Sequence, residues 1–144
     1  MNEILDKQLC EKYPKIFAGR NSPMTETCMC WGFGHGDGWY NIINQLCSNI
    51  QGHIDWNNSQ RERLLKENKH NLTIPDEIKQ VVATQVKEKF GTLRFYYEGG
   101  DSKIDGMVRM AESMSSVTCE TCGKPGTTGG TGWIHTACED HRRK

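Results

Sequence analysis

Apolar residues recur every three to four positions in three stretches of the chain, which is the spacing of one face of a helix. The first stretch covers residues 2–12, with apolar side chains at Ile4, Leu5 and Leu9. Pro14 disfavours helical backbone angles at the residue before it. The pattern therefore predicts a short helix that ends just before Pro14.

The second stretch is the clearest amphipathic pattern in the chain. Its apolar stripe consists of Trp39, Ile42, Ile43, Leu46, Cys47, Ile50 and Ile54. Asp37 precedes the stripe, where its carboxylate is placed to accept the first amide hydrogens of the helix and so to cap it. The residues that follow, 55–71, are strongly polar, and we expect a solvated helix or a mobile connection there.

A third helix is expected after residue 101. Asp101 is placed as its cap, and its apolar stripe consists of Ile104, Met107, Val108, Ala111 and Met114. Earlier in the chain, residues 28–33 alternate cysteines and aromatic residues with smaller ones, which predicts a strand or an extended segment.

Residues 80–98 contain two runs of β-branched and aromatic residues that meet at Phe90 and Gly91, a pattern typical of a β-hairpin. A turn centred there pairs Glu88 with Leu93, Val86 with Phe95 and Thr84 with Tyr97. The largely apolar surface of this ribbon should pack on the long helix. The sequence thus predicts an α+β fold, with amphipathic helices packed on a β-hairpin or small antiparallel sheet.

The same register sets Lys87 directly opposite Arg94 on the other surface of the hairpin, beside Tyr96. Like charges facing each other across strands are unfavourable unless an anion lies nearby. The two cations could clamp a phosphate or carboxylate while the tyrosine ring stacks on a base. The alternative is a solvated sheet face on which Glu88 and Glu98 balance the charge.

The last quarter of the chain contains a metal-ligand pattern. Cys119 and Cys122 form a C-x2-C pair, and Cys138 and His141 form a C-x2-H pair after a glycine-rich spacer. Soft and borderline ligands at this spacing predict a structural Zn²⁺ site of the Cys3His type, in which three thiolates leave no open position. His135 is an alternative fourth ligand, and free buried cysteines are the alternative to a metal.

Two other groups of residues could carry chemistry. Cys28 and Cys30, with Cys10, Cys47 and His35, could assemble a second metal site, although lone cysteines are also common small core residues. In Gly34-His35-Gly36-Asp37-Gly38, His35 could act as an acid or base oriented by Asp37, or the glycines could cradle an anion at a helix start. A tight turn is the third possibility. Without an accompanying nucleophile, anion binding is favoured over catalysis.

Composition narrows the setting. Of 144 residues, 18 are basic and 18 acidic, so no global charge would drive the protein onto nucleic acid or a membrane. No apolar run reaches membrane-spanning length, and the first residues lack the pattern of a signal peptide. We therefore expect a cytoplasmic protein. Seven cysteines, an odd number, fit reduced thiols and a metal better than disulfides. The domain prediction is a core of residues 1–116 and a zinc-ribbon-like module of residues 117–144.

Three phrases of the sequence together resemble a family of small uncharacterised proteins carried by bacteriophages and prophages. They are Gly36-Asp37-Gly38-Trp39-Tyr40, the hairpin phrase of residues 85–97, and the cysteine pattern with Gly123, Pro125, Gly126, Gly132 and Trp133. The likeness covers residues 5–141. Many relatives carry a cysteine where this chain has His35, which leaves a local metal role open. The resemblance implies an accessory role in an infected bacterial cell and assigns no catalytic residue.

The expected function is non-enzymatic binding that interferes with a host process such as an immune defence. The target would be a host protein, or an anionic nucleotide signal held by Lys87, Arg94 and Tyr96 with His35 and Asp37. One alternative is a nucleic-acid-binding regulator of transcription or replication built on the zinc ribbon, whose basic edge would consist of Lys124, Arg142, Arg143 and Lys144. A second alternative is a metal-dependent hydrolase or nuclease. The oligomeric state is open, with a homo-oligomer possible.

Overall fold

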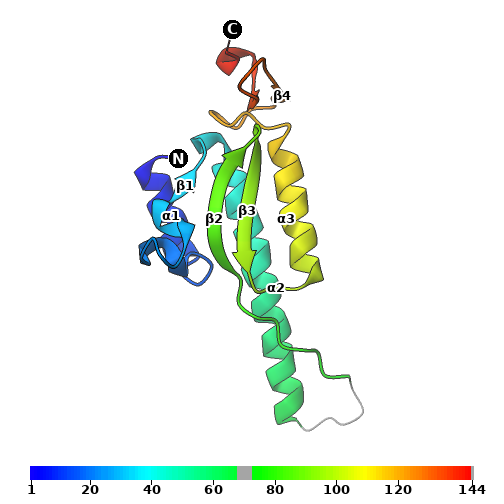
Figure 1. Cartoon of the computed structure of the whole chain (residues 1–144). Coiled ribbons are helices and arrows are strands. Elements are labelled where there is room, and N and C mark those ends of the chain that lie inside the picture. The colour runs from blue at the N-terminus through cyan, green and yellow to red at the C-terminus, as the bar shows by residue number, and fades with distance from the viewer. Residues whose placement is uncertain (68–72, 144) are drawn as a thin grey trace.

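The predicted hairpin forms the centre of the fold. The structure is a computed structural model that describes residues 1–67 and 73–143. Its α-helices are α1 (Glu3–Lys12), α2 (Tyr40–Lys66) and α3 (Ser102–Ser115) (Figure 1). The strands are β1 (Phe33–Gly34), β2 (Val82–Lys89), β3 (Thr92–Glu98), β4 (Thr127–Gly129) and β5 (His135–Ala137). Short 3-10 helices cover Ala18–Asn21, Cys28–Trp31, Asp37–Trp39 and Glu139–His141. The α+β prediction is confirmed.

The register of β2 and β3 follows the sequence prediction up to a bulge. The confirmed pairs are Val86 with Phe95, Lys87 with Arg94 and Glu88 with Leu93. Thr84 does not pair with Tyr97, because the register shifts between Ala83 and Gln85 and Tyr97 pairs with Ala83. The turn places two successive residues, Phe90 (φ 53°) and Gly91 (φ 85°), in the left-handed region, as a tight two-residue hairpin turn requires.

The sheet is mixed, not antiparallel as predicted, because β1 adds a third strand parallel to β2. Phe33 pairs with Val86 and Gly34 with Lys87. The extended segment expected at residues 28–33 is instead a 3-10 helix, Cys28–Trp31, followed by this two-residue strand.

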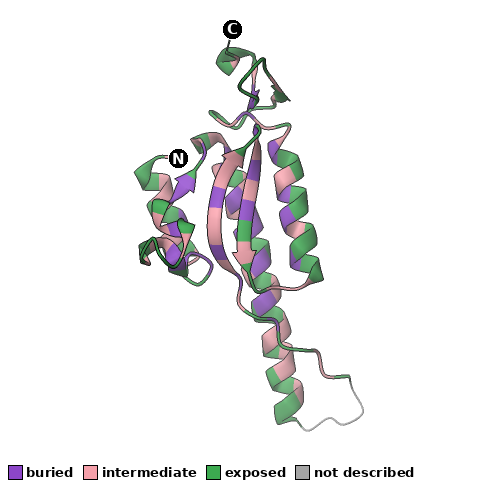
Figure 2. Ribbon diagram, in the orientation of Figure 1, coloured by how far each residue is buried: buried purple, intermediate pink, exposed green. Residues whose placement is uncertain are grey.

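Helices α2 and α3 cover one face of the sheet, and in the described part of the chain no element lies over the other (Figure 1). The core fills the space between the layers and consists mainly of apolar side chains from the three α-helices and from β1, β2 and β3. Buried residues are interleaved with half-buried or exposed ones along β2 and β3 (Figure 2). Because successive side chains of a strand point to opposite faces, the buried ones face the helices and most of the others face the open side. The sheet therefore presents one bare polar surface.

Helix α3 also closes the outer edge of β3. The Leu93 amide donates to the Ser115 hydroxyl at 2.8 Å, and the Phe95 amide donates to a Glu112 carboxylate oxygen at 3.1 Å. Two edge amides that would otherwise need water or another strand are thus satisfied within the chain.

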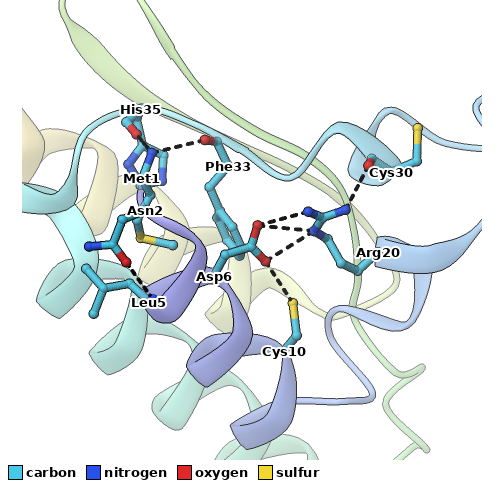
Figure 3. A network of polar contacts seen from close by, with 9 residues as sticks. All are labelled: Met1, Asn2, Leu5, Asp6, Cys10, Arg20, Cys30, Phe33 and His35. Carbon is cyan, nitrogen blue, oxygen red and sulfur yellow. Dashed lines mark hydrogen bonds and ion pairs between the residues drawn. The ribbon is translucent and has the colours of Figure 1, made fainter.

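The N-terminal segment is tied to β1 and to the other edge of the sheet (Figure 3). Asn2 caps α1 by accepting from the Leu5 amide, and the Met1 amino group contacts the Phe33 and His35 carbonyl oxygens. Arg20 pairs with Asp6 at 3.0 Å. These contacts hold α1 against the strand that leads into the glycine-rich turn.

Helix α2 contains the predicted stripe from Ile42 onward, whereas Trp39 lies in the 3-10 helix that precedes it. The buried stripe residues of α2 are Ile43, Leu46, Cys47, Ile50 and Ile54. The helix extends through the polar stretch to Lys66, and residues 68–71 of that stretch lie outside the described residues. Within the described ranges, none of the helices has both the length and the hydropathy of a membrane span.

Candidate metal centre and ligand-binding surface

Four C-terminal side chains converge on one point. The ligand atoms of Cys119, Cys122, Cys138 and His141 all lie within 4.8 Å of one another. The Cys122 and Cys138 sulfur atoms are 3.7 Å apart, and Nδ1 of His141 lies 3.5 Å from the Cys119 sulfur and 3.2 Å from the Cys138 sulfur. This is the set predicted from sequence, and the arrangement suits a bound metal ion.

The rival ligand, His135, lies elsewhere. It is buried, its Nδ1 faces the Trp133 carbonyl oxygen at 3.2 Å, and its Nε2 accepts from the Arg143 amide at 3.5 Å. His141 is therefore the histidine of the cluster.

The loop between the first two cysteines shapes this centre. The Cys119 amide donates to the Lys124 carbonyl oxygen and the Gly123 amide to the Cys119 carbonyl oxygen, so the chain curls around the sulfur. Gly123 adopts φ +80°, which a residue with a Cβ rarely does. Burial raises the pKa of Cys119, but backbone amides of Cys138, Cys122 and Thr121 outweigh it and bring that pKa to about 6. A thiolate is the form that binds metals.

Arg142 holds the small β4–β5 hairpin together. Its guanidinium donates to the Thr127 carbonyl and hydroxyl oxygens and, at 2.9 Å, to the Ala137 carbonyl oxygen. Lys124 lies 3.8 Å from Asp140. Two cations of the basic edge expected for nucleic acid thus have partners within the module, and Lys144 lies outside the described residues.

The glycine-rich turn is the docking site of the cysteine loop. The Gly38 amide donates to the Glu120 carbonyl oxygen at 2.7 Å, and the Gly36 amide donates to Oε1 of Glu120 at 3.0 Å. A Cβ on Gly38 would lie 2.1 Å from the Cys119 carbonyl oxygen, and one on Gly36 would lie 2.4 Å from that of Glu120. The sequence predicted that the amides of this turn could bind an anion. In the structure the Gly36 and Gly38 amides are instead bonded to Glu120 of the protein itself.

Two further contacts join the module to the core. The Thr136 hydroxyl donates to the Gly91 carbonyl oxygen at 2.6 Å, and the indole nitrogen of Trp39 donates to the Thr118 carbonyl oxygen at 2.9 Å. The module is therefore bonded both to the turn between β2 and β3 and to the residue before α2.

His35 is part of the core and does not face the open sheet surface. Its side chain is 6% exposed and lies between the rings of Phe33 and Trp39. Nδ1 faces the Gly36 carbonyl oxygen at 2.7 Å, whereas Nε2 has no partner in the described part of the chain. Burial lowers the pKa of His35 to about 4, although the hydrogen bond to Gly36 raises it in part. The ring is therefore neutral at pH 7.

Asp37 does not cap α2, contrary to the prediction. Its carboxylate accepts from the backbone amide of Asn2 at 2.7 Å and from the side-chain amide of Asn2 at 3.0 Å. A 3-10 turn, Asp37–Trp39, separates this carboxylate from the first residue of α2. The side chain is exposed but points toward the N-terminal segment and not toward Lys87 or Arg94.

The other cysteines do not form a second cluster. Among residues 1–67 and 73–143, only the four C-terminal side chains gather as metal ligands. Cys47 is buried in the core, and Cys28 is exposed. Cys10 lies 3.5 Å from Asp6 in the N-terminal network of Figure 3, and burial, followed by Asp6, raises its pKa to about 12. Cys10 is thus a protonated thiol.

Three of the five predicted ligand-binding residues, Lys87, Arg94 and Tyr96, meet on the open sheet face. Lys87 pairs with Arg94 across the strands, and both side chains are half-buried. Tyr96, two residues after Arg94 and on the same face of β3, is 40% exposed. Arg94 donates to the Thr92 hydroxyl and the Leu93 carbonyl oxygen, which fixes its guanidinium along its own strand. Neither cation has an acidic partner among the described residues. Glu88, one expected counter-charge, instead accepts from the Gly91 amide.

Two residues of the site could not be anticipated. Glu120 bonds to the glycine-rich turn and Arg142 bonds across the β4–β5 hairpin. From the sequence, Glu120 had no assigned role and Arg142 belonged only to the expected basic edge. The only sequence signal was the three interleaved glycines, which marked a close backbone approach without identifying the partner. Comparison of the chain with protein-family models, curated proteins and solved structures finds no match.

Proposed function

We propose that the protein is a non-enzymatic binder that holds an anionic, nucleotide-type ligand on its open sheet face, with a C-terminal zinc ribbon as a structural clasp. The single observation that carries the proposal is the register pairing of Lys87 with Arg94 on an uncovered face, without an acidic partner in the described residues.

Zinc is the metal that best fits the site formed by Cys119, Cys122, Cys138 and His141. Three thiolates and an imidazole are its preferred ligands in closed structural sites. With metal–ligand bonds of about 2.3 Å for sulfur and about 2.1 Å for nitrogen, a tetrahedron has edges of about 3.8 Å and about 3.6 Å. The distances of 3.7, 3.5 and 3.2 Å between ligand atoms are close to these values. The four side chains complete the coordination shell, so the ion would stabilise the fold.

Metal content tests this assignment. The purified protein should contain one zinc per chain by elemental mass spectrometry, and Cys122→Ser should lose most of it. Cys28→Ser is the matched control, because Cys28 is exposed but lies outside the cluster. Equal zinc content in the two variants would contradict the assignment.

Three side chains in a row along β3 match the parts of a nucleotide. Arg94, Tyr96 and Glu98 occupy alternate positions on the open face, about 7 Å apart. Arg94 and Lys87 would bind phosphate oxygens, the Tyr96 ring would stack on the base, and Glu98 would accept from ribose hydroxyls or a base amino group. A cleft of about 470 Å³ beside Tyr96 contains Glu98 and also Glu26. The face is therefore cationic at one end and acidic at the other.

Thermal shift assays test the ligand class. ADP-ribose and cyclic nucleotides at saturating concentration should raise Tm by several degrees, because a ligand at about 100 Kd stabilises the folded state by about 2.7 kcal/mol. Arg94→Ala should abolish the shift. Arg63→Ala is the control, since Arg63 lies at the far end of α2. If no nucleotide raises Tm, or if Arg94→Ala leaves the shift unchanged, the proposal fails.

The state of His35 supports binding over hydrolysis. A hydrolase or nuclease would need this histidine or a metal with an open position, and His35 is buried, neutral and bonded to Gly36. The role of Arg142 within its own hairpin likewise favours the sheet face over the zinc module as the binding surface. A setting in phage infection, with a host defence signal as the ligand, remains a prediction from the resemblance.

A further inference from the structure

An apolar groove runs between α2 and α3 on the helical side of the molecule, away from the open sheet face. Its volume is about 530 Å³. One wall and the floor come from α2 (Asn41, Ile42, Gln45, Leu46 and Asn49), and the other wall comes from α3 (Gly106, Met107, Met110, Ala111 and Met114). The proposed ligand site uses none of these residues.

Two of the three methionines of the groove are exposed to solvent. Met110 is 63% exposed and Met114 is 49% exposed, although Met114 belongs to the predicted apolar stripe. Methionine side chains are flexible and adapt to a partner surface. The helix thus presents apolar side chains that the protein's own core does not use.

Gly106 gives the groove a second unusual feature. It lies inside α3, where glycine weakens a helix relative to alanine, yet nothing lies within 4 Å of the position that its Cβ would occupy. No close approach within the described chain explains the glycine. Open space at a mid-helix glycine is what a neighbouring helix needs for close approach.

We propose that a second copy of this chain docks in the groove, with the two α3 helices antiparallel and a two-fold axis at Met110. Gly106 and Met114 each lie four residues from Met110, about 6 Å along the helix in opposite directions. An antiparallel crossing at Met110 therefore sets Met114 of each copy over Gly106 of the other. The Met114 side chain of each copy then fills the open space at Gly106 of the other, so the same contact forms twice, as an isologous interface requires.

The charge of the groove favours a second copy over another partner. Near a two-fold axis every charged group meets its own kind, so a self-complementary interface must be neutral there. None of the ten lining residues is charged. The rim residues Asn41, Gln45 and Asn49 carry amides, which both donate and accept hydrogen bonds and can therefore pair with copies of themselves.

Sedimentation and light scattering over a concentration series test the proposal on the zinc-loaded protein. The groove is lined by ten residues, so we expect a dimer with a Kd in the range of about 1–100 µM. Met110→Glu should shift the protein to monomer, because it places two carboxylates at the axis. Met24→Glu, at a methionine of similar exposure outside the groove, should stay dimeric. A wild-type monomer at all concentrations, or a dimer that survives Met110→Glu, would overturn the proposal.

A second variant, which favours the helix, tests the interface in case Met110→Glu loses the dimer by misfolding. Gly106→Leu fills space that is empty in the monomer and replaces a poor helix former, so it should raise the monomer's Tm while abolishing the dimer. In the double variant Gly106→Leu with Met114→Ala, the new leucine of one copy fills the space left by the shortened residue 114 of the other. This variant should therefore be dimeric again. A dimeric Gly106→Leu, or a double variant without rescue, would reject the antiparallel arrangement. Zinc content and the nucleotide shift should stay unchanged in the variants of Met110, Gly106 and Met114, which lie outside the proposed ligand site. Met24 lines the cleft beside Tyr96, so its variant is compared by oligomeric state alone.

Discussion

The Gly38 amide donates a hydrogen bond of 2.7 Å to the Glu120 carbonyl oxygen and joins the start of the longest helix to the metal-binding loop. The two residues are 82 positions apart, as their numbers show. Because the contact is between backbone groups, it depends on the absence of a side chain at Gly38 and not on the chemistry of one.

Gly38→Ala should separate the cysteine loop from the core. Its Cβ would lie 2.1 Å from a backbone oxygen, so the loop must move and the Glu120 bond is lost. We expect a loss of about 2–4 kcal/mol in the free energy of unfolding, measured by urea denaturation. In Gly52→Ala, where nothing lies within 4 Å, the same substitution should stabilise α2 by up to about 1 kcal/mol. Similar effects at both positions would show that the close approach is not maintained in solution.

Chelation of the metal should loosen residues 117–143 and leave the helix-and-hairpin core folded. Ligand binding and folding are coupled in small metal modules, whereas the core is built on its own apolar cluster. Hydrogen exchange measured by mass spectrometry should show lost protection in the module and retained protection in β2 and β3. Loss of protection throughout would mean that the boundary at residue 116 does not separate two folding units.

Acid should destabilise the protein through His35. The pKa of its ring is about 4 in the folded state, because burial disfavours the charged form, whereas the pKa of a free histidine side chain is 6.5. The unfolded chain therefore binds the proton more readily, and stability is lost as pH falls from about 6.5 toward about 4, by up to about 3 kcal/mol. His35→Phe should flatten that part of the stability profile measured by urea denaturation. A variant profile parallel to that of the wild type would contradict the buried, neutral state.

Ser115→Ala should destabilise the fold although it removes only one oxygen atom. Ser115 is fully buried and accepts from the Leu93 amide, which would then have no partner. An unsatisfied buried amide costs about 1–3 kcal/mol. Ser113→Ala, at an exposed position on the same helix, should change the free energy of unfolding by less than about 0.5 kcal/mol. Thermal denaturation of the pair measures the difference.

Local patterns predicted the elements whose signals are local. The hairpin register follows from strand alternation and from a turn that needs two left-handed residues, and the metal cluster follows from a knuckle encoded by Cys119, Cys122 and Gly123. The register failed at Ala83 and Gln85, because a bulge has no sequence signature as strong as a turn.

Contacts between distant segments were beyond sequence reasoning. The strand β1 is two residues long and exists only because β2 offers it a partner. Asp37 satisfies every local criterion for a helix cap, yet Asn2 competes for its carboxylate. Glu120 resembles a solvated acid until the fold brings the glycine-rich turn within reach of it. In each case tertiary structure determined the partner.

The pairing of Glu112 and Ser115 with the β3 amides limits how the protein can associate. A bare strand edge is a template onto which a peptide or another copy can add a strand, and such growth leads to aggregates. Here the helix that follows the strand occupies that template, so the sheet ends at three strands. A substitution that unwinds the end of α3 would thus expose the unpaired amides of the β3 edge to other chains before it unfolded the core. Fibril growth under mild destabilisation should begin at β3.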